Sequence, residues 1–243
     1  MSLDYKLKIA KKAVLEAAKT ILYRYDSRDF LSTKQKADGG LSTHADEEAE
    51  ICIRDILLRK FPGNGFVGEQ KYAILGRDGF KWYCDAIDGT HSFINGEKTA
   101  STSLALTQFD KTILAIVYNP FTNELFSGAA GGQCKLNGYP IPRFNRVDPS
   151  KAVYNIQISA DRKADTNDLY SLWEQKDIGK LVSTGGSVAY SLALVAQGVH
   201  SSYISSMGKP YAVWDTIAGI YLIESVGGKV SFLEEDKILI AST

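Results

Sequence analysis

Three apolar segments separated by short turns constrain the fold more than any other feature of the sequence. Residues 101–108, 112–119 and 124–130 have the sequences STSLALTQ, TILAIVYN and ELFSGAA. Asn-Pro at 119–120 and Gly-Gly at 131–132 are turn-forming pairs that follow the second and third segments. This pattern predicts consecutive antiparallel strands of one sheet.

Helical patterns precede these strands. Residues 4–25 carry apolar side chains at helical spacing, which predicts a long amphipathic helix. A second helix is expected from about Asp46, with acids in its first turns and basic residues in its last, and Pro62 ends it. The polar stretch between the helices, residues 32–45, contains two adjacent glycines and predicts a mobile loop.

After about residue 152 the pattern changes to alternating strands and helices. Further strands are expected over residues 65–69, 81–84, 153–159, 180–184, 200–205 and 228–235, the last being the final strand. Further helices are expected over residues 166–175, 186–198 and 215–226. This order of elements predicts an α/β or α+β layered domain. We expect one domain over residues 1–243 with two lobes, 1–148 and 149–243.

Composition narrows the possible partners. The 243 residues include 28 Lys plus Arg and 28 Asp plus Glu, so the formal net charge is zero, and we expect neither a nucleic-acid nor a membrane partner. The three cysteines are far apart and form no CxxC pair, which disfavours a zinc site or a disulfide framework and fits a cytoplasmic location. The N-terminal residues lack the uninterrupted apolar stretch of a signal peptide or membrane span.

The stretch WYCDAIDGTHSF, residues 82–93, carries the clearest chemical signal. Asp85 and Asp88 lie at the end of an expected strand, where two carboxylates and the Ile87 carbonyl could hold a Mg²⁺ ion. Gly89 would let a ligand approach the backbone, and Thr90 offers a hydroxyl where free N–H groups favour phosphate. The alternative is an Asx-type turn with acids that face solvent.

Three other acids each have a simpler explanation when taken alone. Glu69 follows Gly68 at the end of a short strand and could be an exposed loop acid. Asp46 and Asp215 each stand at the start of a helix, where aspartate commonly serves as a cap. Each residue by itself therefore leaves the structural and the functional alternatives open.

Taken together, four segments resemble the signatures of the inositol monophosphatase family. They are LSTHADEEAE, VGEQ, WYCDAIDGTHSF and WDTIAGIYLIESVGG, in the family's order, and the resemblance runs from about Lys36 to the C-terminus. It implies the layered αβαβα sandwich of the sugar phosphatases. It also implies a Mg²⁺-dependent, lithium-sensitive phosphomonoesterase that acts as a homodimer on a small phosphorylated metabolite.

The resemblance assigns roles residue by residue. The implied ligands of two Mg²⁺ ions are Glu69, Asp85 and the Ile87 carbonyl for the first, and Asp85, Asp88 and Asp215 for the second. The implied catalytic residues are Asp46, Thr90 and Glu69. Asp46 and Thr90 would orient the attacking water, and Asp46 would also lie near a third, weakly held ion. The implied substrate-binding residues are Asp88, Gly89, Thr90, Gly186, Ser187, Val188 and Asp215.

The sequence departs from the family pattern at positions beside these residues. Ala86 replaces a proline, Ser92 an asparagine, and Gln70 the second acid of the family's GEE segment. Members that act on inositol phosphate have an acid before the final Trp-Asp, but here Ser205 and Ser206 occupy that region. The alcohol therefore stays open among inositol phosphate, histidinol phosphate, an adenosine bisphosphate, fructose bisphosphate and NADP. A non-catalytic protein that binds metal and phosphate is the alternative.

Overall fold

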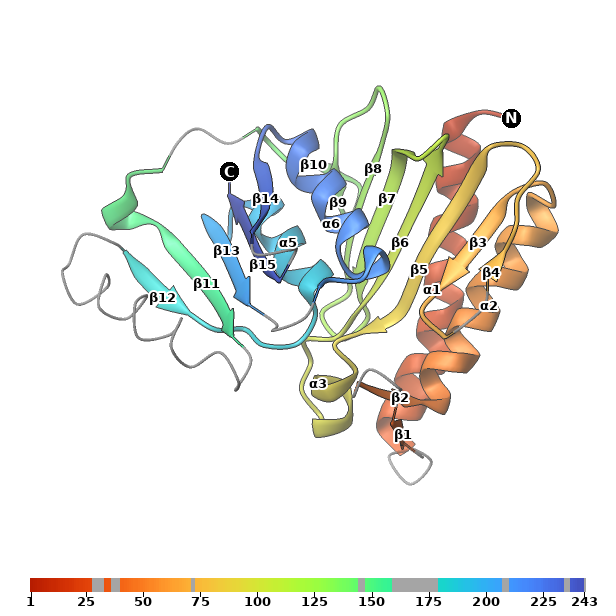
Figure 1. Ribbon diagram of the computed structural model, residues 1–243, viewed down its shortest axis with the longest axis horizontal. Coiled ribbons are helices and arrows are strands. Elements are labelled where there is room, and N and C mark those ends of the chain that lie inside the picture. Colours follow the sequence, from red (N-terminus) through yellow and green to blue (C-terminus); the bar gives the residue numbers. More distant parts are fainter. Residues whose placement is uncertain are drawn as a thin grey trace.

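The computed structural model describes residues 1–27, 33–35, 40–70, 73–143, 147–158, 179–206, 210–233 and 237–242. The described elements form four layers: two helices, an eight-stranded sheet, two further helices and a five-stranded sheet (Figure 1). The chain is therefore a mixed α/β fold, as the sequence predicted. The helix expected over residues 166–175, which would complete a fifth layer, lies outside the described residues.

The large sheet contains the predicted antiparallel strands at its centre. Its strand order is β10-β9-β8-β7-β6-β5-β3-β4. The strands are β3 (Gly65–Gly68), β4 (Ala73–Ile74), β5 (Phe80–Asp88), β6 (Ser101–Gln108), β7 (Lys111–Asn119), β8 (Glu124–Ala129), β9 (Lys135–Leu136) and β10 (Tyr139–Pro140). The expectation for β6, β7 and β8 is confirmed, because each pairs antiparallel with the next.

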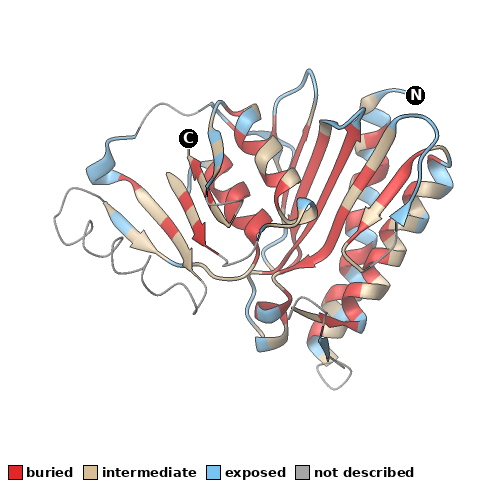
Figure 2. Cartoon of the chain, viewed as in Figure 1, coloured by how far each residue is buried: buried red, intermediate tan, exposed pale blue. Residues whose placement is uncertain are grey.

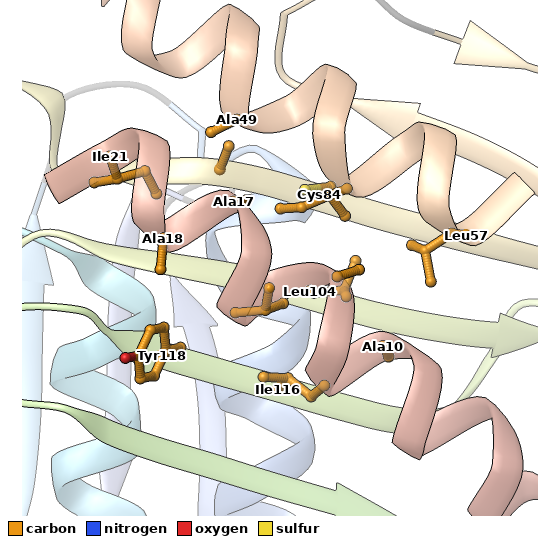
Figure 3. Close-up of a cluster of buried hydrophobic side chains, with 14 of the residues drawn as sticks. Ala10, Ala17, Ala18, Ile21, Ala49, Leu57, Cys84, Leu104, Ile116 and Tyr118 are labelled. Carbon is orange, nitrogen blue, oxygen red and sulfur yellow. The ribbon is translucent and has the colours of Figure 1, made fainter. Parts of the chain in front are cut away.

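Both faces of this sheet are covered, which explains why its central strands are almost continuously apolar. Leu104 and Leu106 of β6 face α1 (Leu3–Ser27) and α2 (His44–Lys60), whereas Ala105 faces the opposite core. Alanines on both helices lie close to the strands (Figure 3), and small side chains there let the layers approach closely. Buried residues accordingly run through all the central strands (Figure 2).

The small sheet differs from the prediction in one strand. Its order is β12-β11-β13-β15-β14, made from β11 (Val153–Ile158), β12 (Lys180–Val182), β13 (Ser202–Ser206), β14 (Lys229–Leu233) and β15 (Ile238–Ser242). The expectation that β14 is the final strand is wrong, because β15 follows it. β15 pairs antiparallel with both β13 and β14, so this short apolar segment lies inside the sheet.

Helices α5 (Val188–Gln197) and α6 (Val213–Ser225) pack between the two sheets. They lie so close together that a Cβ at Gly219 would come within 2.5 Å of the Leu192 side chain. The remaining elements are β1 (Thr33–Gln35), β2 (Leu41–Thr43), α3 (Thr90–Asn95) and the short 3₁₀ helix η1 (Pro149–Lys151). The loop expected over residues 32–45 instead contains β1 and β2, which pair antiparallel.

Candidate metal centre

Three aspartates from distant parts of the chain meet at one point. Asp85 and Asp88 come from the end of β5, and Asp215 comes from the first turn of α6. Each offers a carboxylate oxygen, and these oxygens all lie within 4.8 Å of one another. Asp85 and Asp88 are only 3% and 6% exposed. The described structure thus brings together two of the four segments that resemble the family signatures.

A bulge in β5 allows its two aspartates to act together. Side chains alternate along a strand, so residues three positions apart would normally point to opposite faces. Asp85 pairs with Ser103 and Asp88 with Ser101, which places three steps of β5 against two of β6. The extra residue reverses the alternation and turns both carboxylates toward α6. The strand therefore continues through the acids, whereas the sequence pattern had predicted its end at Cys84.

The bulge itself contains part of the Asx-type turn that the sequence left open as an alternative. The Ile87 N–H donates to Asp85 Oδ1 at 2.9 Å, which is the hydrogen bond of an Asx-type turn. The two acids are nevertheless buried and do not face solvent. The Ile87 carbonyl accepts the Thr90 hydroxyl at 3.1 Å, so the turn also anchors the first residue of α3.

Glu69 reaches the same place because β3 runs parallel to β5. Gly68 pairs with Cys84, and the Glu69 N–H donates to the Cys84 carbonyl at 3.1 Å. The carboxyl ends of the two strands therefore lie side by side, with Glu69 next to Asp85. Glu69 is half-buried and its Oε2 accepts a hydrogen bond from Gln70 Nε2 at 3.1 Å, so it is not simply an exposed loop acid.

Asp46 contributes both to the N-terminal cap of α2 and to the candidate site. The N-cap of this helix is Thr43, whose N–H and hydroxyl donate to Asp46 Oδ2 at 2.8 and 2.6 Å in a capping box. The other oxygen, Oδ1, accepts the Thr90 hydroxyl at 3.1 Å. Asp46 is fully buried. Its capping role therefore fixes the orientation in which it contacts Thr90.

Asp215 lies in the first turn of α6 and is not its N-cap. The helix begins at Val213 with Ala212 as the cap residue, and no side chain caps it. The sequence expectation of a helix start at Asp215 is thus two residues late. Asp215 lines the cavity together with Asp85 and Asp88.

Two glycine turns bring β5 and α5 into contact. Gly89 has φ +86°, and a Cβ there would lie 2.8 Å from the Ser187 nitrogen and 2.9 Å from the Gly186 carbonyl carbon. Asp88 Oδ2 accepts the Ser187 hydroxyl at 2.5 Å and the Ala189 N–H at 2.7 Å. Ser187 is completely buried, so its side chain holds Asp88 and does not enter the cavity.

A cavity of about 430 Å³ opens over these groups. Its described lining is Gly40, Leu41, Glu69, Asp85, Asp88, Gly89, Thr90, His91, Ser92, Gln157, Gly186, Val188, Pro210, Tyr211, Ala212, Trp214 and Asp215. Sequence reasoning missed Gln157, whose Oε1 accepts the Tyr203 hydroxyl at 2.8 Å. Tyr211, downstream of Ser205 and Ser206, also lines the cavity. Gln157 has no local sequence signal, because only the neighbouring elements direct it here.

Burial and crowding favour the protonated forms of these acids. Burial, followed by the charges of Glu69, Asp88 and Asp215, raises the pKa of Asp85 well above its usual range. Burial likewise raises the pKa of Asp88 to about 7, although the hydrogen bonds from Ser187 and Ala189 oppose the shift. Clustered carboxylate oxygens are the ligands that a hard cation such as Mg²⁺ prefers, so the donor set fits such an ion.

Comparisons with known proteins agree with the geometry. The model of the inositol monophosphatase family matches residues 2–243. The chain is 30% identical over 228 residues to an inositol-1-monophosphatase of Rhizobium meliloti, covering 91% of this chain and 83% of the relative. It is 29% identical over 232 residues to the Nus factor SuhB of Escherichia coli, covering 93% and 84%.

The fold is also found among solved structures. The extragenic suppressor protein SuhB of Bartonella henselae superposes with a TM-score of 0.87 and 24% identity, over 97% of this chain and 93% of that one. At this identity the likeness establishes the fold and nothing further.

Proposed function

The chain belongs to the inositol monophosphatase family, and from this premise we propose that it is a Mg²⁺-dependent phosphomonoesterase. Membership supports a phosphatase of this superfamily. The observation that carries the proposal is the convergence of Asp85, Asp88 and Asp215 on a cavity that Glu69 and Thr90 also line. The substrate would be a small phosphorylated alcohol of the inositol phosphate kind.

The acids fit the roles of metal ligands. Glu69, Asp85 and the Ile87 carbonyl would hold one Mg²⁺ ion, and Asp85, Asp88 and Asp215 a second, with Asp46 near a third. Bound ions would neutralise the phosphate dianion, lower the pKa of a bound water and stabilise the leaving alkoxide. Gly89, which has no side chain, leaves room for the phosphate to approach the backbone of the turn.

Asp46 and Thr90 would orient the attacking water. Asp46 Oδ2 is committed to Thr43, so Oδ1 is the oxygen that accepts the Thr90 hydroxyl. When Thr90 donates to Asp46, its lone pairs are directed to accept a hydrogen bond from water. The water oxygen would then bond to phosphorus as the bond between phosphorus and the alcohol oxygen breaks. The proton lost by the water would pass through the Thr90 hydroxyl to Asp46, and the alcohol would leave with a proton from solvent.

A binding protein with little catalysis is the second candidate. One relative is named a Nus factor and not an enzyme, and Gln70 departs from the acidic pattern beside the proposed ligands. An intact Asp46–Thr90 pair favours the enzyme, because binding metal and phosphate needs no group that orients water.

Several expectations from the sequence stay predictions beside this proposal. They are a homodimer, lithium inhibition, a cytoplasmic location, no nucleic-acid or membrane partner, and the two lobes divided at residue 148. Within the described residues, no helix combines the length and apolar character needed to cross a bilayer.

Phosphate release separates the two candidates. The purified chain would be incubated with inositol monophosphate, histidinol phosphate, an adenosine bisphosphate, fructose bisphosphate and NADP, in Mg²⁺, in EDTA and with added lithium. Mg²⁺-dependent release from one of them would support the enzyme and identify its alcohol. Mg²⁺ binding in calorimetry without release from any of them would favour the binding protein.

A further inference from the structure

A second buried carboxylate lies on α2, one turn beyond Asp46. Glu50 is fully buried, and its Oε2 accepts the Gln70 N–H at 3.0 Å. Within the described part of the chain, its Oε1 has no hydrogen-bond partner. Neither the family signatures nor the proposed ligand set gives this residue a role. Buried carboxylates are costly, so a carboxylate held here needs a reason.

The end of β3 is shaped to receive this carboxylate. A Cβ at Gly68 would come within 2.2 Å of Glu50 Oε1 and 2.5 Å of Glu50 Oε2. Only glycine therefore leaves room for the carboxylate directly beneath the strand end. Gly68 immediately precedes Glu69, so the Glu50 side chain packs under the backbone that carries a proposed metal ligand.

Gln70 links Glu50 to that ligand. Its backbone N–H is held by Glu50, and its side-chain Nε2 donates to Glu69 Oε2 at 3.1 Å. The Glu69 N–H is fixed in turn by the Cys84 carbonyl. Both the backbone and the carboxylate of Glu69 are thus restrained, the first by β5 and the second by Gln70.

The chemistry of position 70 matters here. Gln70 is neutral and donates a hydrogen bond, whereas the acid that the family pattern has at this position would be an acceptor when ionised. The donor holds the Glu69 carboxylate by a hydrogen bond and limits its rotation, and it adds no negative charge to a crowded group of acids. In metal sites, partners of this kind orient the ligands, and their loss costs about 10- to 100-fold in metal affinity or activity.

We propose that Gln70 is a positioning residue for Glu69 and that Glu50 anchors Gln70, so that the two together set the Mg²⁺ affinity of the site. This inference rests on the proposed function, because it assumes that Glu69 binds the metal. It gives a role to a buried glutamate and a departure from the family pattern that the reaction itself does not explain.

Calorimetric titration of Mg²⁺ into Gln70→Met tests the first step. Methionine keeps the length of the side chain but removes the donor. We expect Mg²⁺ binding to weaken by about ten-fold, while the Tm in EDTA stays within experimental error of the wild type. The matched control is Gln108→Met, which makes the same change at an exposed end of β6 and should leave Mg²⁺ binding unchanged.

Two substitutions of Glu50 test the anchor. Glu50→Gln keeps an oxygen that can accept the Gln70 N–H, so Mg²⁺ affinity should stay within about two-fold of the wild type. Glu50→Leu removes the acceptor and should weaken Mg²⁺ binding as Gln70→Met does. If Glu50→Gln loses as much Mg²⁺ affinity as Glu50→Leu, the charge of Glu50 is the important property. The proposal that Glu50 anchors Gln70 by accepting its N–H would then be wrong.

The outcomes distinguish this inference from the proposed function. A wild-type chain that binds no Mg²⁺ would overturn both. A wild type that binds Mg²⁺ and a Gln70→Met variant with the same affinity would overturn only the positioning role. A Gln70→Met variant that loses affinity together with Tm in EDTA would mean that Gln70 acts through general stability, which also contradicts the inference.

Discussion

Asp88 shows how a single residue can belong to the site and to the fold at once. One of its oxygens accepts hydrogen bonds from Ser187 and Ala189 at the start of α5, and the carboxylate also faces Asp85 and Asp215. Burial raises its pKa to about 7, so the ionised form is disfavoured where no cation is bound. Its charge is therefore costly to the fold, and the hydrogen bonds from Ser187 and Ala189 compensate only part of that cost.

Replacing Asp88 by asparagine should consequently harm activity far more than folding. We expect Asp88→Asn to reduce the rate of Mg²⁺-dependent phosphate release by at least about 100-fold. Loss of a residue that only supports a ligand costs about 10- to 100-fold, and loss of a ligand should cost more. The Tm in EDTA should not fall, because a neutral amide removes repulsion between the acids. Asp110→Asn on the exposed β6–β7 turn is the control. Near-normal turnover in Asp88→Asn would contradict the assignment of Asp88 to the metal site.

The Thr90 hydroxyl gives a second prediction at this scale. Thr90→Val removes the group that contacts Asp46 Oδ1 and Ile87 O but keeps the shape of the side chain. We expect kcat to fall by about 10²- to 10⁴-fold, the range for loss of a positioned proton acceptor, with Mg²⁺ affinity little changed. Thr90→Ser, which retains the hydroxyl, should keep most of the activity. Equal kcat values for the two variants would exclude a role for the hydroxyl.

At the scale of elements, the site depends on how strand ends and helix starts meet. β5 and β3 are parallel, so Asp85 and Glu69 lie at one edge of the large sheet. The bulge in β5 turns Asp88 to the same side as Asp85, toward α6. The turn at Gly89 then contacts the turn at Gly186 closely enough that no side chain fits between them.

Gly89→Ala should therefore destabilise the protein by more than backbone strain alone. A residue other than glycine in the left-handed conformation costs of order 1–3 kcal/mol. The added methyl group would also displace the turn before α5. Gly138→Ala is the matched control, because Gly138 has φ +88° but nothing lies within 4 Å of its Cβ position. Urea denaturation should show a larger loss of unfolding free energy for Gly89→Ala. Equal losses would mean that the contact between the turns contributes nothing.

At the scale of the whole molecule, helices on both sides of the large sheet bring the site together. α2 contributes Asp46 from one side of the sheet and α6 contributes Asp215 from the other, while β5 supplies Asp85 between them. These carboxylates are held close by the packing of two hydrophobic cores. The packing of the rest of the fold offsets the repulsion between these carboxylates.

The metal-free protein should consequently lose stability as the pH rises. Burial raises the folded-state pKa of Asp85, and raises those of Asp88 and Glu50 to about 7. A carboxyl with a raised folded pKa contributes stability at low pH and loses it as the pH passes through that pKa. Between about pH 5 and 8 in EDTA, a loss of about 2 kcal/mol would lower the Tm by roughly 4–8 °C. Saturating Mg²⁺ should remove most of this fall, and a Tm in EDTA that rises from pH 5 to 8 would contradict it.

Elements whose residues carry a local or repeated pattern could be predicted from the sequence alone. Periodic apolar residues predicted α1, and the placement of charges before Pro62 predicted α2. Apolar runs bounded by glycine or turn residues predicted α5 and the strands β6 to β8. The short strand β15 has only a brief apolar run, so its place between β13 and β14 could not be inferred. The four segments that contain the candidate acids, with their neighbouring glycines and tryptophans, indicated the family.

How these residues act together depends on the packing of distant segments. The bulge that aligns Asp85 with Asp88, the burial that raises their pKa values, and the contacts of Gln157, Glu50 and Gln70 all depend on segments distant in the chain. No local pattern encodes them, because an interaction between residues far apart in sequence forms only when the layers pack. The sequence thus supplied the proposed ligands, and packing supplied the distances between them and the burial that raises their pKa values.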